Sequence, residues 1–114
     1  MGVREELLEK AEEFQKEARR CLKNGSLDSA VVLISKAAFS IVDSYLFENF
    51  GFIPSDHTKR KDAVGFRIPR LLPFLMDVYD RYVAAYQQRM TRVDVEVVLD
   101  AFEKICEITE IKVG

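Results

Sequence analysis

One histidine and the cations that follow it are the residues of this chain best suited to chemistry. His57 is the only histidine, and Lys59, Arg60 and Lys61 follow it within about one helical turn. An imidazole exchanges a proton near neutral pH, and cationic side chains bind phosphate. One hypothesis is therefore that these residues bind a phosphate or an RNA backbone. The alternative is that His57 caps a helix or lies at the surface, and that the cations are simply solvated.

Two arginines and an aspartate late in the chain form a second candidate set. Residues 87–94 read QQRMTRVD, which places the guanidinium groups of Arg89 and Arg92 near the carboxylate of Asp94. Guanidinium groups bind anions through paired hydrogen bonds, and a carboxylate can hold one of them in orientation. Anion binding by Arg89 and Arg92, with Asp94 orienting one of them, is one hypothesis. An Arg–Asp pair combined with a helix cap is the other.

Polar residues also interrupt an apolar segment in the first half of the chain. Lys36, Ser40 and Asp43 recur at helical spacing and therefore share one helix face. They line either a polar groove, which would be a pocket or a subunit interface, or a partly exposed helix edge.

Three aromatic residues later in the chain can stack on bases, or can belong to the core or a subunit interface. These are Tyr79, Tyr82 and Tyr86.

The sequence does not support a metal site or a nucleophilic active site. Cys21 and Cys106 are widely separated, and a single histidine cannot complete a zinc motif with them. We expect no metal and no cofactor, and we expect both cysteines to act as small buried hydrophobic residues. Neither a nucleophilic triad nor a glycine-rich phosphate loop is recognisable, so no catalytic residue is assigned.

Length and composition indicate one globular domain spanning residues 1–114. Apolar residues make up 48% and charged residues 32%, with a formal net charge of −2 and a pI near 5.5. This balance predicts no general attraction to DNA, to other nucleic acids or to anionic membranes. The apolar runs are shorter than the roughly 18 residues of a membrane span, and the N-terminal residues do not resemble a signal sequence. We expect a cytoplasmic protein.

Two long helices are predicted in the first half of the chain. The first covers about residues 3–23, where apolar residues recur every three or four positions. Asn24 and Gly25 end it, because both tolerate the left-handed conformation of a helix C-cap, and Ser26 is expected to cap the next helix. That second helix, about residues 27–50, is apolar on most of its circumference and should be central.

Two more long helices are predicted in the second half of the chain. Gly51 and Pro54 end the second helix, and a short helix can begin near residue 55, with an interruption at Gly65. A third long helix follows through residue 86. The alternation in RVDVEVVL suits a strand, but the apolar residues keep a helical period for three turns. We therefore predict a fourth helix over about residues 92–111, with Thr91 and Asp94 as a capping box.

These elements together predict an all-α fold. Four helices with short connections form an antiparallel, up-and-down four-helix bundle, and a short additional helix fits between the second and the third.

The order of three segments resembles the HEPN domain family of small helical bundles. An opening helix is followed by a short turn and an alanine-containing central helix, LKNGSLDSAVVLISKAAFSIVDSYLFENFG. The stretch from Gly51 to His57 is similar to a loop of the family that runs from a glycine to a histidine. RMTRVDVEV lies where members often carry an arginine and a nearby aspartate before the last helix. The resemblance covers roughly residues 10–110.

The resemblance implies a homodimer, often partnered with a minimal nucleotidyltransferase in a toxin–antitoxin pair. Many members are ribonucleases with an Arg-x(4–6)-His motif late in the chain. This sequence departs from that pattern, because the residues five to seven positions before His57 are Phe50, Gly51 and Phe52. Members without the motif resemble non-catalytic binding or partner subunits.

Three hypotheses for function follow. The first is a non-catalytic, HEPN-like dimer that binds a partner protein or a nucleotide. The second is an RNA-cleaving toxin with a degenerate motif, using Arg89, Arg92 and His57 brought together across a dimer. The third is a helical adaptor, because LKNGSLDSAVVLISKAA is similar to a tetratricopeptide turn.

Overall fold

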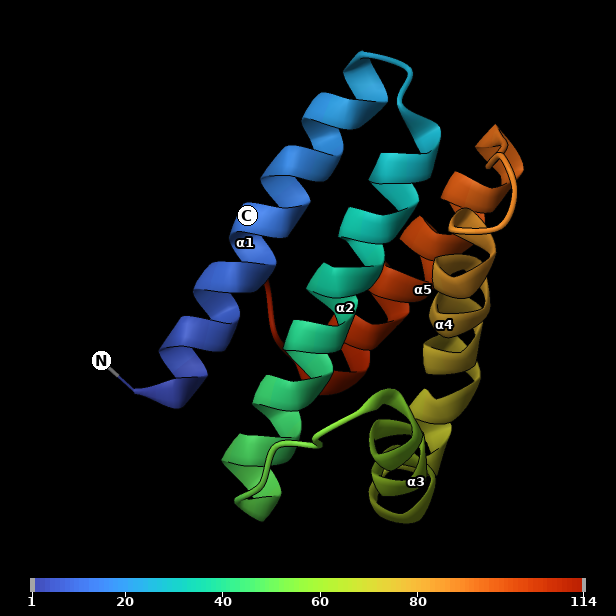
Figure 1. Cartoon of the computed structure of the whole chain (residues 1–114). Coiled ribbons are helices and arrows are strands. Elements are labelled where there is room, and N and C mark those ends of the chain that lie inside the picture. Colours follow the sequence, from blue (N-terminus) through green and yellow to red (C-terminus); the bar gives the residue numbers. More distant parts are fainter. Residues whose placement is uncertain (1, 114) are drawn as a thin grey trace.

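The computed structural model describes residues 2–113, and this part of the chain contains helices and no strand (Figure 1). The elements are α1 (Val3–Lys23), α2 (Leu27–Phe50), α3 (His57–Arg67), the 3₁₀ turn η1 (Pro69–Leu71), α4 (Leu72–Ala85) and α5 (Arg92–Thr109). The all-α prediction is confirmed, including a helix rather than a strand for RVDVEVVL. The expected four-helix architecture is not confirmed, because the described residues form five α-helices.

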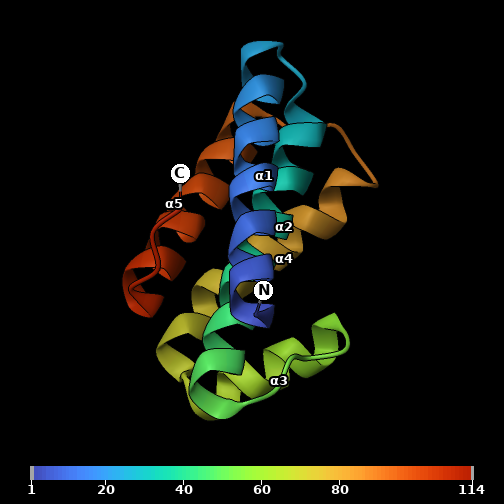
Figure 2. The same cartoon turned by 90° about the vertical axis from the view of Figure 1, so that its left-hand side faces the viewer.

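α2 is the central helix, as its apolar circumference predicts. It packs against α1, α4 and α5, and thirteen of its residues are buried. The four long helices alternate in direction along the chain, whereas α3 lies across one end of the molecule (Figure 1, Figure 2). By length and hydropathy α2 also meets the test for a membrane span, but 72% of its most apolar window is buried inside the protein. That burial is typical of the core helix of a helical domain.

The helix ends show which of the predicted capping residues adopt the expected conformation or make the expected hydrogen bonds. Gly25 and Gly51 adopt positive φ angles of 74° and 78°, which are the left-handed conformations expected after a helix. Thr91 and Asp94 form the predicted capping box at the start of α5. The prediction for Ser26 is wrong, because its side chain makes no capping hydrogen bond. The nearby carboxylate of Asp28 bonds instead to the backbone N–H of Met90, which ties the start of α2 to the loop before α5.

α3 is a continuous helix, so the predicted interruption at Gly65 is wrong. A Cβ at Gly65 would lie 3.6 Å from the Leu72 side chain, an ordinary contact, so no close approach requires glycine there. The Asp56 carboxylate caps the helix by accepting a 2.8 Å hydrogen bond from the backbone N–H of Lys59. Along α3 only Arg60 and Val64 are buried, and these two side chains attach the helix to the rest of the fold.

An apolar groove of about 800 Å³ lies between α1, α5 and the residues after α5. It exists because α1 packs mainly on α2 and leaves one side of α5 uncovered. Its lining includes the apolar residues Leu99, Phe102 and Cys106 and the acidic residues Glu103 and Glu107. The two cysteines are free and only half-buried, so the expectation that both are buried is wrong.

Candidate functional site

A buried ion pair between α2 and α3 is the centre of the candidate site. Arg60 donates from Nε to Oδ1 of Asp43 and from Nη2 to Oδ2, both over 2.8 Å. The two residues are 8% and 7% exposed. A charge inside an apolar helix is costly unless it is paired, and the two-pronged geometry satisfies both oxygens of the carboxylate. Asp43 is the only acidic residue in the middle of α2, and Arg60 is the cation that compensates it.

His57 extends this pair into a group of three polar residues. Nη1 of Arg60 lies 2.7 Å from Nδ1 of His57. Because a guanidinium group is always a donor, Nδ1 must be the acceptor, and the proton of the neutral imidazole is then on Nε2. The third arm of the Arg60 guanidinium group is therefore bound to histidine, while the other two hold the carboxylate.

Aromatic rings enclose the imidazole. The centroid of the His57 ring lies 4.7 Å from Phe39, 5.2 Å from Tyr79 and 5.4 Å from Tyr82. The guanidinium carbon of Arg60 lies 4.9 Å from the centre of the Phe39 ring, within the range of a cation–π interaction. The polar group is thus packed against apolar faces contributed by α2 and α4, and α3 is held at both its first turn and its centre.

The surroundings shift the pKa of two groups of the site. Burial lowers the pKa of His57 below its usual value, the positive charge of Arg60 lowers it further, and the more distant Asp43 carboxylate opposes the shift. Burial also raises the pKa of Tyr82 above its usual value, with a further contribution from Tyr86. The site therefore favours a neutral imidazole and a neutral phenol at physiological pH.

The lysines beside His57 do not join Arg60 in one cationic cluster. Lys59 is exposed, and Nζ of Lys61 lies 4.1 Å from the centre of the Tyr79 ring. Arg60 itself is buried and its charge is compensated by Asp43. Of the proposed phosphate-binding set of His57, Lys59 and Arg60, the structure therefore brings only His57 and Arg60 into contact.

The predicted polar stripe of α2 is divided between two environments. Asp43 belongs to the buried pair, and Ser40 is also buried at 7% exposure. Lys36 lies on the side of α1, where its Nζ is 5.9 Å from the centre of the Phe14 ring. The three residues share one helix, but only Asp43 contributes to the site around His57.

The set of Arg89, Arg92 and Asp94 is not assembled as expected. Arg89 pairs with Asp28 over 2.9 Å, and Asp94 pairs with Arg81 of α4 over 3.0 Å. Asp94 also accepts a 2.8 Å hydrogen bond from the backbone N–H of Thr91, and this bond is the main cause of its lowered pKa. Asp94 therefore orients Arg81 rather than Arg89 or Arg92, and Arg92 is exposed.

The sequence gives only part of this site. It draws attention to Asp43, to the cations around Arg60 and to the tyrosines of α4, but in separate hypotheses. Phe39 carries no sequence signal beyond its place in an apolar helix. A usable signal is the single carboxylate in the middle of α2, because a buried acid requires a cation from another element.

Within residues 2–113 there is no cluster of three or more histidine, cysteine, aspartate or glutamate side chains able to hold a metal ion. The site around His57 places a neutral imidazole next to a guanidinium group whose charge is compensated by Asp43.

Comparison with known proteins identifies the family. The family model described as HEPN domain matches residues 4–112, which is nearly the whole chain. No curated protein and no solved structure shows significant similarity to this chain. The match covers α1 from its second residue and all the later helices to the end of α5. The chain therefore belongs to the HEPN domain family.

Proposed function

We propose that this HEPN domain is a non-catalytic binding subunit that acts through a partner macromolecule. The observation that carries the proposal is the closed arrangement of Asp43, Arg60 and His57, in which all three arms of the guanidinium group are used within the protein. Metal-independent RNA cleavage needs an accessible cation for the phosphate and a group that exchanges a proton near neutral pH. Arg60 is buried and paired, and the lowered pKa of His57 disfavours its protonated form.

The proposed assembly is a homodimer bound to a minimal nucleotidyltransferase, the pairing that the family resemblance implies. Support comes from the match over residues 4–112 and from the absence of an Arg-x(4–6)-His motif in the sequence. Co-expression with a nucleotidyltransferase encoded beside this chain is the direct measurement. A stable complex at defined stoichiometry in light scattering is expected, and a monomer at micromolar concentration that does not bind the nucleotidyltransferase would contradict this assembly.

An RNA-cleavage assay tests the non-catalytic role. Wild-type protein and the His57→Ala variant should both leave a structured RNA and a single-stranded RNA intact at micromolar protein concentration and pH 6–8. Cleavage by wild type that is lost in His57→Ala, with the helical circular dichroism unchanged, would overturn the proposal. Arg19→Ala is the matched control, because Arg19 is an exposed arginine of α1 and belongs to none of the proposed sites.

One observation favours an RNA-cleaving enzyme as the second candidate. His57 and Arg60 lie 2.7 Å apart, and a histidine beside an arginine is the pair of groups that the family's ribonuclease motif supplies. Here the two residues occur in the reverse order, with two residues between them on one helix. For this candidate to hold, RNA binding must release Arg60 from Asp43. The Asp43→Asn variant should then cleave RNA faster than wild type.

A further inference from the structure

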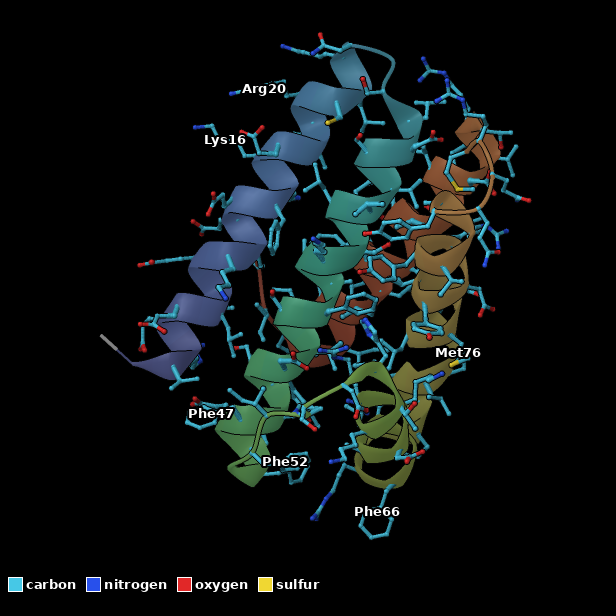
Figure 3. All side chains as sticks on the ribbon, viewed as in Figure 1. Lys16, Arg20, Phe47, Phe52, Phe66 and Met76 are labelled. Carbon is cyan, nitrogen blue, oxygen red and sulfur yellow. The ribbon has the colours of Figure 1, made fainter. Side chains whose placement is uncertain are left out.

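The most exposed apolar side chains of the described chain include a group at the α3 end of the molecule. Phe66 is 79% exposed, Ile53 is 42% exposed and Phe50 is 37% exposed. Phe66 projects from α3 away from the rest of the molecule (Figure 3). Together with Arg67 these residues are called the α3 aromatic surface. A contiguous exposed apolar patch rimmed by polar residues marks an interaction site, and aromatic residues and arginine are enriched in the centres of protein interfaces.

Arg67 joins the two phenylalanines into one surface. Its guanidinium carbon lies 4.9 Å from the centre of the Phe50 ring and 5.1 Å from that of Phe66. Among residues 2–113 no carboxylate lies within ion-pair distance of Arg67. The arginine is therefore held by ring faces, and its charge remains available to an external anion.

The charge around the surface is positive, although the whole chain is slightly acidic. Residues 55–70 carry five cationic and two acidic side chains, and one of the cations, Arg60, is compensated by Asp43. Lys59, Arg67 and Arg70 are exposed. A partner that covers Phe66 therefore meets a positive rim, which attracts acidic groups and repels basic ones.

The helix that carries the surface is fixed in place. The Arg60–Asp43 pair and the buried side chain of Val64 attach α3 to the rest of the fold, and the Asp56 carboxylate caps its first turn. Such a surface does not have to be ordered when a partner binds, so little affinity is lost to conformational entropy.

We infer that the α3 aromatic surface docks an acidic amphipathic segment of a partner protein. The inference rests on the proposed function of a partner-binding subunit and adds the chemistry of the partner. Apolar side chains of the segment cover Phe66, Phe50 and Ile53, and its carboxylates face Arg67 and the neighbouring cations. A second copy of this chain fits less well, because two positive surfaces would face each other. RNA fits less well because Ile53 offers neither a ring for base stacking nor a donor for phosphate.

Peptide binding tests the inference directly. The probe is a synthetic helical peptide with leucine and phenylalanine on one face and glutamate on the other. Two comparison probes are the same peptide with lysine in place of glutamate, and single-stranded poly(U). Fluorescence anisotropy with wild-type protein should show saturable binding of the glutamate peptide alone. Phe66→Ala and Arg67→Glu should each weaken that binding by roughly tenfold or more, as expected for residues at the centre of an interface.

Matched control variants test whether the loss of peptide binding is specific to the α3 aromatic surface. Tyr86→Ala removes another exposed aromatic ring, and Arg92→Glu reverses another exposed charge, both at the α4–α5 connection. Both controls should bind the peptide as wild type does. All four variants alter exposed side chains, so each should keep the wild-type thermal unfolding midpoint, and amide chemical shifts should change mainly in α3 when the peptide binds.

Four results would overturn the inference. The glutamate peptide does not bind, or it binds Phe66→Ala as tightly as wild type. Poly(U) binds and loses its affinity in Phe66→Ala, which would assign the surface to RNA. A dimer becomes a monomer in Phe66→Ala and Arg67→Glu, which would assign it to a second copy. RNA cleavage dependent on His57 would instead overturn the proposed function, and that assay involves none of the residues of the α3 aromatic surface.

Discussion

Arg60 of α3 and Asp43 of α2 form a two-pronged, buried ion pair, with both hydrogen bonds 2.8 Å long. The two residues are 17 positions apart in sequence. The pair connects the centre of the core helix to a short helix that otherwise buries only Val64. It is consequently the main polar attachment of α3.

Removing one member of this pair should strongly destabilise the fold. Asp43→Ala leaves the buried guanidinium group without its carboxylate, and loss of one partner of a buried pair costs about 3–5 kcal/mol. The double variant Asp43→Leu with Arg60→Met removes both charges and should recover most of that loss. Urea unfolding of Asp43→Leu, Arg60→Met and the double variant measures the coupling energy of the pair. Single variants as stable as wild type would show that the pair does not anchor α3.

His57 should make stability depend on pH in a defined direction. The pKa of His57 is lowered in the folded protein, so below the ordinary histidine pKa near 6.5 the unfolded chain binds more protons than the folded one. The free energy of unfolding is therefore expected to decrease as the pH falls from about 7.5 through 6.5 toward the lowered pKa of the folded state.

Chemical unfolding at several pH values measures this dependence. His57→Phe keeps a ring among Phe39, Tyr79 and Tyr82 and should flatten the curve between pH 5.5 and 7.5. A wild-type curve that is already flat over this range would show that the imidazole titrates normally. Nuclear magnetic resonance of the single histidine gives the folded-state pKa directly.

Asp28 should stabilise the loop between α4 and α5. Its two carboxylate oxygens accept hydrogen bonds from the backbone N–H of Met90, over 2.7 Å, and from Arg89, over 2.9 Å. The Met90 bond is the main cause of its lowered pKa, and Arg89 contributes next. Its stabilising effect is present above the unfolded-state pKa near 3.8 and is lost as the pH falls through the lower folded-state value.

Asp28→Ala should lower the thermal unfolding midpoint at pH 7 and increase amide exchange at Met90. Asp100→Ala is the control, since Asp100 is an exposed acid on α5. Equal midpoints for the two variants would mean that the loop does not depend on Asp28.

Cys106 should be an unreactive thiol. Burial, with a smaller contribution from Glu103, raises the pKa of Cys106 to about 11. Since the thiolate is the reactive form, alkylation by iodoacetamide at pH 8 should be roughly a hundredfold slower than that of a small free thiol. Mass spectrometry of the Cys21→Ser variant isolates the rate at Cys106. A rate equal to that of the free thiol would show that the α1–α5 groove is open and hydrated at this position.

Helix positions could be predicted from the sequence where local signals coincide with the apolar pattern. The bounds of α1 and α2 agree with prediction, because Gly25 and Gly51 end both helices by their own backbone preference. The start of α5 agrees as well, since the capping box depends on residues three positions apart. Gly65 misled the prediction, because a glycine inside a helix weakens it without ending it when neighbours such as Val64 are buried.

The site was predictable only as separate parts. Asp43, Arg60 and His57 were each candidates, but the distance between α2 and α3 depends on the path of residues 51–56, which no periodicity encodes. The same applies to Asp94, whose local cap with Thr91 follows from spacing, whereas its pair with Arg81 depends on how α4 and α5 cross. Contacts within one helical turn were accessible to sequence reasoning, and contacts between elements were not.

The packing of α1 on α2 has a consequence for how the molecule opens. α1 buries only Ala11 and Ala18 completely, and its larger apolar residues Leu8, Phe14 and Leu22 are partly buried, whereas α2 is also held by α4 and α5. Loss of α1 would leave α2, α4 and α5 in mutual contact. Native-state hydrogen exchange should therefore resolve α1 as a separate unit that opens at lower free energy than global unfolding. The molecule would then open in two steps, with α1 leaving α2 before the contacts among α2, α4 and α5 are lost.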